Sequence, residues 1–308
     1  MAVREAEMAG GIIVRRIAPA LGAEVSGLDL SRPLKADEVA LLRDTFQQHH
    51  LLLFRKQELS AEQQVAFSQN FGQLETFPEK DKTKGQSLIY HVANTTPEGE
   101  KLTTKDAPVI FQKVNARWHT DSSYRFTPSL ASLMYALEVL PESAEGGETG
   151  FSNMFLAYDA LSPAMKRRLE PLHMVHYYEF GRRLYPELPA VTPEEREFVP
   201  PVSHPVTRVH LDRGGRRSLF ISTNAGNEIG GLSLQEGQAL HRELTAYVGR
   251  DAFTYLHRMA VGDLVMWDNR CLLHRAMPYD MDRYRRVYRR TTVAGDGPIV
   301  GPFSHPPV

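Results

Sequence analysis

The sequence predicts an α+β fold, in which flanking helices surround a β-rich core of the sandwich or jelly-roll kind. Short apolar runs of strand length recur along the chain and end at residues that favour turns. Helical periodicity occurs early in the chain and in insertions between those runs. The sequence lacks internal repeats and linker-like segments, so we expect a single domain over residues 1–308, with flexible ends at 1–10 and 297–308.

Local signals predict the individual elements in order. We expect strands where apolar or alternating runs end at turn residues, namely at 12–16, 22–30, 51–54, 88–92, 130–140, 205–211, 218–222, 253–259, 264–267 and 285–293. We expect helices where apolar residues recur at helical spacing, in most cases behind a serine cap, namely at 36–48, 61–71, 163–169 and 234–248. The polar segment 75–116 predicts a long loop region around one short strand, and 182–205 predicts an exposed excursion.

Composition describes an ordinary globular chain and excludes several function classes. The 308 residues are 42% hydrophobic and carry a formal net charge of −1, which argues against nucleic-acid or membrane-surface binding driven by bulk charge. The one cysteine, Cys271, lies in an apolar run, so we expect a buried, inert thiol and no intrachain disulfide. We see no secretory signal, and no apolar stretch reaches the roughly 18 residues of a membrane span. We therefore expect a cytoplasmic protein without nucleic-acid or membrane partners.

A histidine is followed two positions later by an acidic residue at His119/Asp121, His210/Asp212 and His241/Glu243. Chance predicts about one or two such pairs, so geometry must distinguish them. The pair His241/Glu243 falls in a predicted helix, where residues two apart do not share a face, and a solvated helix face explains it. The other pairs lie in strand-like segments, where residues i and i+2 point the same way and can reach one metal ion. His210/Asp212 therefore remains an alternative to His119/Asp121.

His274 offers a second imidazole, although a histidine behind an apolar run is often an ordinary core or surface residue. Together with His119 and Asp121 it makes two imidazoles and one carboxylate. This is the ligand set of the mononuclear non-haem Fe(II) oxygenases, whose iron keeps open positions for a co-substrate and for O₂.

Four arginines near the last predicted strand indicate anionic ligands. On a strand, Arg286 and Arg290 share one face, and Arg285 and Arg289 share the other. If one face looks into a barrel, two inward guanidinium groups need anionic partners, and a carboxylate matches their geometry. A basic, solvated strand end is the alternative.

Taken in order, these segments resemble a known family over nearly the whole chain. The sequence is similar to the Fe(II)/2-oxoglutarate-dependent dioxygenases of the taurine dioxygenase/2,4-dichlorophenoxyacetate dioxygenase group at Trp118-His119-Thr120-Asp121, Gly146-Gly147-Glu148-Thr149, Trp267-Asp268-Asn269-Arg270, His274-Arg275 and the Arg286/Arg290 pair. The resemblance implies a double-stranded β-helix, or jelly-roll, core with flanking helices. It also implies Fe(II), the co-substrates 2-oxoglutarate and O₂, stimulation by ascorbate, a small-molecule substrate, and a homodimer or homotetramer.

The resemblance also implies roles for individual residues. The implied iron ligands, which form the catalytic centre, are His119, Asp121 and His274. Thr149 and Arg286 are expected to bind the distal carboxylate of 2-oxoglutarate. Arg290 is expected to bind the acidic group of the main substrate, with Asn115 and Ser122 as further substrate contacts.

Within the group, the sequence looks more like the phenoxyacetate enzymes, for example at Asp121-Ser122-Ser123-Tyr124. No histidine follows Phe71-Gly72-Gln73-Leu74, which argues against a small aminosulfonate, and lysines within 80–84 are candidates to grip a carboxylate. We therefore expect hydroxylation of an aryloxyacetate such as 2,4-dichlorophenoxyacetate, which yields a phenol and glyoxylate, with succinate and CO₂ from 2-oxoglutarate. The alternatives are a taurine/alkylsulfonate or alkylsulfate dioxygenase, a cupin-like metal-binding protein without turnover, and a Zn(II) hydrolase.

Overall fold

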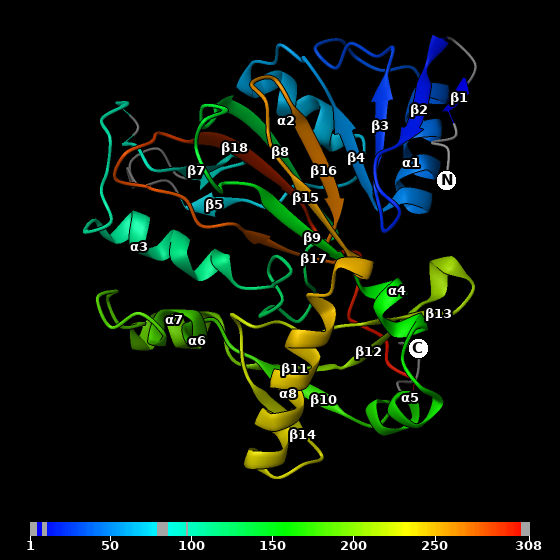
Figure 1. Ribbon diagram of the computed structural model, residues 1–308, viewed down its shortest axis with the longest axis vertical. Helices are drawn as coiled ribbons and strands as arrows, with labels where there is room; N and C mark the ends of the chain where they lie inside the picture. Colours follow the sequence, from blue (N-terminus) through cyan, green and yellow to red (C-terminus); the bar gives the residue numbers. More distant parts are fainter. Residues whose placement is uncertain (1–4, 8–10, 79–85, 97, 303–308) are drawn as a thin grey trace.

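Two packed β-sheets form the centre of the protein (Figure 1). The computed structural model describes residues 5–7, 11–78, 86–96 and 98–302. The larger sheet has eight strands in the order β1-β2-β3-β4-β16-β8-β18-β7, and the smaller has three in the order β15-β9-β17. Strands β3 and β4 pair in parallel, and the other pairs in these two sheets are antiparallel. This is the jelly-roll core that the sequence predicts.

Each strand that the sequence predicts is present, with shifted ends in most cases, but no strand was predicted at β9 or β17 of the smaller sheet. The larger sheet consists of β1 (Glu5–Glu7), β2 (Ile13–Arg16), β3 (Ala23–Ser26), β4 (Leu51–Phe54), β16 (Leu264–Asp268), β8 (Ala131–Glu138), β18 (Val287–Val293) and β7 (Tyr90–Ala93). The smaller sheet consists of β15 (Thr254–His257), β9 (Thr149–Asn153) and β17 (Leu272–Ala276). Outside them lie β5 (Phe77–Pro78), β6 (Gln86–Ser87), β10 (His173–His176), β11 (Val202–Pro205), β12 (Thr207–His210), β13 (Arg216–Leu219) and β14 (Glu228–Gly230).

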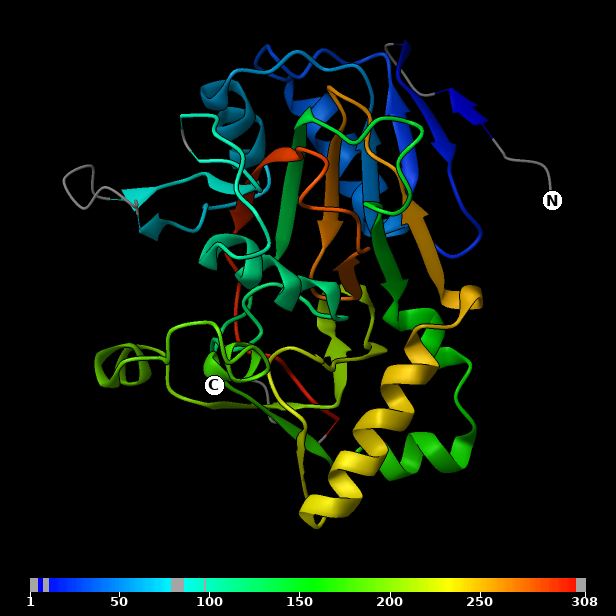
Figure 2. The ribbon, with the colours of Figure 1, turned by 60° about the vertical axis from the view of Figure 1, so that its left-hand side comes forward.

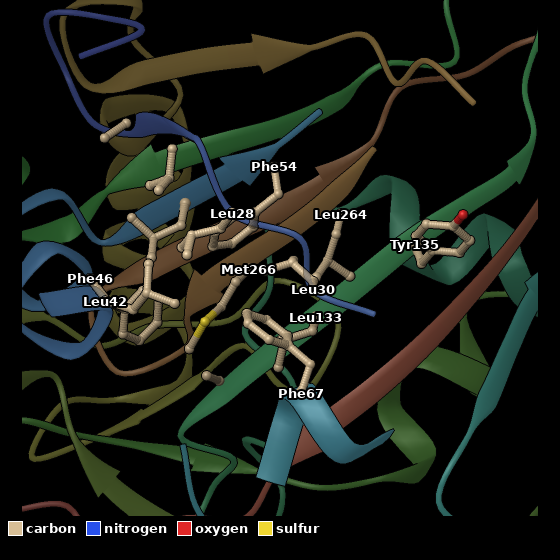
Figure 3. Close-up of a cluster of buried hydrophobic side chains, with 14 of the residues drawn as sticks. Leu28, Leu30, Leu42, Phe46, Phe54, Phe67, Leu133, Tyr135, Leu264 and Met266 are labelled. Carbon is tan, nitrogen blue, oxygen red and sulfur yellow. The ribbon is translucent and has the colours of Figure 1, made fainter. Parts of the chain in front are cut away.

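Strand β4 shows why its run Leu51-Leu52-Leu53-Phe54 is apolar throughout. Leu52 and Phe54 belong to the core beneath helices α1 (Ala36–His49) and α2 (Ala61–Gln69), which Figure 3 shows around Phe46, Phe67 and Met266. Leu51 and Leu53 point the other way, into the core shared with Phe151 and Leu272 of the smaller sheet. Successive strand residues face opposite sides, so a strand buried on both faces must be apolar at every position.

The segments inserted between these strands build a second body beside the sheets, seen below them in Figure 1 and turned in Figure 2. Its helices are α3 (Ala107–Lys113), α4 (Met154–Asp159), α5 (Pro163–Leu169), α6 (Glu179–Arg183), α7 (Pro193–Phe198) and α8 (Leu234–Val248), with 3-10 turns η3 (Val114–Ala116), η4 (Leu211–Arg213) and η5 (Asp251–Phe253). Helix α8 packs through Leu240, Leu244 and Val248 into a cluster that includes Trp118 and Leu273. These two residues directly precede His119 and His274, so the packing of α8 supports both.

Three further details differ from the sequence predictions, two in the inserted segments and one at His241. The segment 75–116, predicted as loop around one strand, also contains helix α3, because Pro108 stands in its first turn, where proline starts a helix rather than breaking it. The predicted excursion 182–205 contains helix α7 and strand β11. His241 is only 7% exposed, so the expectation of a solvated face is wrong for it and right for the exposed Glu243.

The ends expected to be flexible are partly outside the described residues, which exclude 1–4, 8–10 and 303–308. Within the described parts, Glu5–Glu7 pairs with β2. Ile299 is buried, and the amide of Val209 donates to the carbonyl of Val300 at 2.7 Å. Among the described helices, none is long and apolar enough to cross a membrane.

Candidate metal centre and anion-binding site

His119, Asp121 and His274 come together although 153 positions separate Asp121 from His274 (274 − 121). His119 and His274 form an isolated antiparallel bridge, in which the amide of His274 donates to the carbonyl of His119 at 2.7 Å and the reverse bond is 3.0 Å. One ligand atom from each of the three side chains lies within 4.8 Å of the others, and all three residues are buried. The centre of the His274 ring lies 4.8 Å from that of Trp267 in the larger sheet and 6.4 Å from that of Phe151 in the smaller sheet.

The two imidazoles are neutral and oriented for metal binding. Burial lowers the pKa of His119 and of His274 below the usual value, and a neutral ring nitrogen is the form that binds a metal ion. The Nδ1 atom of His119 lies 2.7 Å from the carbonyl of Arg117, which accepts a hydrogen bond from Nδ1–H, so the lone pair of Nε2 is the one available to a metal ion. The Nε2 atom of His274 lies 3.7 Å from the Asp121 carboxylate.

The carboxylate of Asp121 is held at both oxygens. Ser132 at the start of β8 donates to Oδ2 at 2.6 Å, and Arg290 of β18 donates to Oδ1 at 2.7 Å. The side chain of Asn269 accepts from the amide of Asp121 at 3.3 Å and donates to Ser132 at 3.0 Å. Burial raises the pKa of Asp121, whereas the positive charge of Arg290 and the hydrogen bond from Ser132 lower it, and the resulting pKa lies below its ordinary value. The residue is therefore an ionised, oriented ligand.

The donor set fits Fe(II). Two neutral imidazole nitrogens and one carboxylate oxygen are the donors that this ion takes in the facial arrangement of non-haem oxygenases. The Nδ1 atom of His274 is buried and has no hydrogen-bond partner in the described part of the chain. The hydrogen bond that Ser132 donates to Asp121, and the one that the Arg117 carbonyl accepts from His119, are of the kind that usually orients metal ligands.

Arg286 lies in a buried anion-binding environment. Arg286 is 3% exposed. The central carbon of its guanidinium lies over the rings of Tyr279 and Tyr288, 4.7 and 5.2 Å from the ring centroids. Nη1 donates to the carbonyl of Gly147 at 3.4 Å, while Nε is buried without a partner among the described residues. The edge formed by Nε and Nη2 is therefore free to take a carboxylate, the usual bidentate partner of a guanidinium.

Arg290 presents a similar free edge nearer the metal ligands. Its Nη1 holds Asp121, and within the described residues its buried Nε has no partner. Its guanidinium also stacks on the ring of Tyr90, at 5.1 Å, because Tyr90 of β7 is its cross-strand partner. Arg285 and Arg289 point elsewhere: Arg285 pairs with Glu138 at the surface, and Arg289 donates to the carbonyl of Leu59. Arg289 and Arg290 lie on opposite faces of β18, as predicted, whereas Arg285 and Arg286 come before its first residue, Val287, and the register shifts between Val287 and Tyr288.

The remaining predicted residues differ in what they contact. Thr149 begins β9 directly after the Gly146–Gly147 turn, and it is buried. Asn115 lies half-buried in η3, and its side chain forms no hydrogen bond with another described residue. Ser122 has a positive φ of 55°, and its hydroxyl donates to the buried carboxylate of Glu75 at 3.2 Å. Its role in substrate binding remains a prediction, and the lysines within 80–84 lie outside the described residues.

The rival histidine–acid pairs have other partners. His210 lies 2.8 Å from the hydroxyl of Ser218, while Asp212 pairs with Arg270 at 2.9 Å. His241 faces the carbonyl of Ser222 at 2.9 Å. His210 and Asp212 do not lie on one strand, because β12 ends at His210 and the 3-10 turn η4 begins at Leu211.

A second group of metal-type side chains, His50, Asp268 and Cys271, is an ion-pair network instead. Arg213 and Arg270 place two cations against the fully buried carboxylate of Asp268, and Arg213 also lies 3.0 Å from Nδ1 of His50, so a further cation at this site is disfavoured. Burial raises the pKa of the Cys271 thiol. Cys271 is buried, as predicted, and unsuited to act as a metal ligand or nucleophile.

A jelly roll that carries two histidines and one carboxylate in this arrangement is typical of the non-haem Fe(II) oxygenases. The family model described as "Taurine catabolism dioxygenase TauD, TfdA family" matches residues 13–292. The chain therefore belongs to the TauD/TfdA family of 2-oxoglutarate-dependent, non-haem iron dioxygenases, which use Fe(II) and 2-oxoglutarate.

Curated relatives match about nine tenths of the chain. It is 36% identical to an alpha-ketoglutarate-dependent 2,4-dichlorophenoxyacetate dioxygenase of Cupriavidus pinatubonensis, over 92% of this chain and 98% of that protein. It is 33% identical to an (S)-phenoxypropionate/alpha-ketoglutarate-dioxygenase of Sphingobium herbicidovorans, over 89% and 92%. A crystal structure of AAD-2 in complex with Mn(II) and N-oxalylglycine has a TM-score of 0.83 and 35% identity, and covers 94% of this chain and 98% of that chain.

Sequence reasoning missed several neighbours of the centre, namely Glu75, Tyr90, Tyr124, Ser132, Tyr178 and Tyr279. No local sequence pattern identifies Ser132 or Glu75, because each of them contacts residues that are distant in sequence. The register of β7 against β18 would have identified Tyr90, because it places that residue opposite Arg290.

Proposed function

We propose that this protein hydroxylates an aryloxyacetate at the carbon between its ether oxygen and its carboxylate, using Fe(II), 2-oxoglutarate and O₂. One oxygen atom enters that carbon, and the other enters succinate as 2-oxoglutarate loses CO₂. The hydroxylated carbon is a hemiacetal, which breaks its bond to the aryl oxygen and yields a phenol and glyoxylate. The observation that carries the proposal is the pair of guanidinium edges of Arg286 and Arg290, one for each carboxylate.

Each protein group has a defined task in this reaction. His119, Asp121 and His274 hold the iron, which when bound supplies the O₂ chemistry. Arg286 and Thr149 hold the distal carboxylate of 2-oxoglutarate. Arg290 shares its charge between Asp121 and the substrate carboxylate, which brings the adjacent carbon of the substrate close to the metal ligands.

Aromatic side chains near Arg290 favour an aryl group on the substrate. The rings of Tyr124 and Tyr178 meet edge to face at 5.0 Å, and Tyr90 stacks on Arg290. Tyr178 is fixed by a hydrogen bond from Arg182 at 3.2 Å. Such rings offer an aryl substrate stacked and edge contacts worth about 0.5–1.5 kcal/mol each. The names of the phenoxyalkanoate dioxygenases to which the chain is similar agree with this choice.

A product assay tests the substrate class. Purified protein with Fe(II), ascorbate and 2-oxoglutarate is incubated with phenoxyacetate, 2,4-dichlorophenoxyacetate, a 2-aryloxypropionate, taurine or an alkyl sulfate. We expect phenol and glyoxylate to form in step with succinate from the aryloxyacetates. Faster coupled turnover of taurine or of the alkyl sulfate would replace the proposal with the sulfonate or sulfate alternative.

A pair of variants tests the assignment of the arginines. Arg286→Ala should raise the KM for 2-oxoglutarate about 10- to 100-fold, and Arg290→Ala should do the same for the aryloxyacetate, since each removes a charge-assisted bond. The two KM values are measured for both variants. The opposite pattern would exchange the roles of the two arginines.

A further inference from the structure

We infer that Tyr279 is a further 2-oxoglutarate-binding residue, whose hydroxyl donates a hydrogen bond to the distal carboxylate. The inference rests on the proposed function, because it takes Arg286 as the anchor of that carboxylate. No sequence pattern singles out Tyr279, and only its surroundings in the fold indicate this role.

The backbone holds Tyr279 beside the predicted 2-oxoglutarate residues. The amide of Met277 donates to the carbonyl of Glu148 at 2.8 Å, and the amide of Gly147 donates to the carbonyl of Pro278 at 3.2 Å. Gly146 has a φ of +74°, and a Cβ there would stand 1.9 Å from the same Pro278 carbonyl oxygen. The chain before Tyr279 is thus bonded to the turn that immediately precedes Thr149.

The hydroxyl of Tyr279 is a buried donor without an acceptor. It has no hydrogen-bond partner within the described part of the chain, and the same is true of the Nε atom of Arg286. The ring of Tyr279 lies 4.7 Å from the centre of that guanidinium. Buried phenol hydroxyls are normally bonded, because an unpaired one is costly. Two unpaired donors at one place indicate a missing acceptor with several lone pairs.

A carboxylate meets this requirement. Its two oxygens offer about four acceptor positions. The Nε/Nη2 edge of Arg286 uses two of them, which leaves positions for the hydroxyls of Thr149 and Tyr279. Burial raises the pKa of Tyr279 and outweighs the opposite effect of Arg286, so the phenol keeps its proton and remains a donor at neutral pH.

The geometry makes an unusual prediction for Tyr279→Phe. Because the hydroxyl has no partner among the residues that the structure describes, its removal should leave the thermal unfolding temperature of the ligand-free protein unchanged or slightly higher. The matched control is Tyr247→Phe in α8, whose hydroxyl donates to the carbonyl of Ala157 at 3.0 Å. The control should lower the unfolding temperature and leave 2-oxoglutarate binding unchanged.

Calorimetric titration of the Mn(II)-loaded protein measures binding without turnover. We expect Tyr279→Phe to raise the Kd for 2-oxoglutarate about tenfold, in line with the loss of one bond to a charged group. The Kd for 2-oxobutyrate, which has the same 2-oxo acid end and no distal carboxylate, should be equal in the wild type and the variant. An equal weakening of both ligands would overturn the inference, as would a fall in the unfolding temperature of the ligand-free variant.

Arg286→Ala separates this inference from the proposed function. If Arg286→Ala weakens 2-oxoglutarate binding and Tyr279→Phe does not, the inference about Tyr279 is wrong and the proposed function stands. If neither variant weakens it, the anchor itself is misassigned and both fail.

Discussion

Ser132 and Arg290 hold opposite oxygens of Asp121, and they have different tasks. Arg290 also presents a free guanidinium edge, whereas Ser132 only orients the carboxylate through its 2.6 Å bond. The hydroxyl of Ser132 accepts from Asn269 in turn, and Asn269 accepts from the indole of Trp267 at 3.0 Å. Strand β16 thereby fixes the direction of a side chain that lies on another segment.

We expect Ser132→Ala to lower the affinity for Fe(II) or Mn(II) about tenfold, because bonds to metal ligands are commonly worth 10- to 100-fold in affinity. Metal titration by calorimetry measures it. The matched control is Ser152→Ala, a buried serine of β9 that bonds to the carbonyl of Val248 at 2.6 Å. Equal metal affinity in the wild type and Ser132→Ala would show that Arg290 alone suffices.

Glu75 illustrates what single residues in the sequence could not disclose. The sequence shows that this position lacks a histidine, but not that Glu75 is buried and binds three side chains. Its carboxylate accepts from Ser129 at 2.6 Å, from Ser122 at 3.2 Å, and pairs with Arg125 at 2.9 Å. These bonds fix the chain that follows Asp121, and they engage the Ser122 hydroxyl that the sequence assigned to substrate.

Helix α8 was predicted with the bounds it has, because both of its determinants are local. Ser233 accepts from the amide of Glu236, and the Glu236 side chain accepts from the amide of Ser233. Leu240, Leu244 and Val248 recur at helical spacing and are buried. Helix α3 was missed for the opposite reason: its apolar residues Val109, Ile110 and Phe111 are consecutive and show no helical spacing, and the proline in its first turn also occurs in loops.

Ser233→Ala should destabilise the protein by about 1 kcal/mol, the usual effect of losing a serine N-cap. Urea unfolding measures this, and the metal affinity should not change. Gln235→Ala is the control, since Gln235 is exposed in the same first turn and its side chain forms no hydrogen bond among the described residues. A destabilisation as large in the control would attribute the effect to helix propensity.

Across the whole molecule, the network around Asp268 joins the larger sheet to the β12–β13 hairpin. Asp268 ends β16, and Arg213 bonds to it from the turn of the hairpin. Burial raises the pKa of Asp268, but Arg270 and Arg213 outweigh burial and hold that pKa well below its ordinary value. The carboxylate is therefore ionised at neutral pH, and it is the counter-charge shared by the guanidinium groups of Arg213 and Arg270.

Asp268→Ala should destabilise the protein by about 3–5 kcal/mol, because it leaves buried guanidinium groups without their counter-charge. A carboxylate with a lowered folded-state pKa adds stability that is complete above the ordinary carboxyl pKa and is lost as pH falls toward the folded-state value. The difference from wild type should thus be constant between about pH 8 and 5 and shrink below about pH 4. Urea unfolding across this range measures it.

The control for this prediction is Asp159→Ala, whose ion pair with Arg216 is exposed on both sides. An exposed pair contributes about 0–1 kcal/mol. A loss in Asp268→Ala no larger than in this control would mean that the buried network does not join the sheet to the hairpin.

The sequence by itself determined the capped and periodic helices, the buried strand β4, the three candidate metal donors and the opposite faces of Arg289 and Arg290. Each of these depends on residues a few positions apart, and short-range geometry decides them. Only the tertiary structure decided that His119 lies against His274, that Asp212 pairs with Arg270, and that Tyr279 meets Arg286. Those contacts depend on how distant segments pair and turn, which no local pattern records.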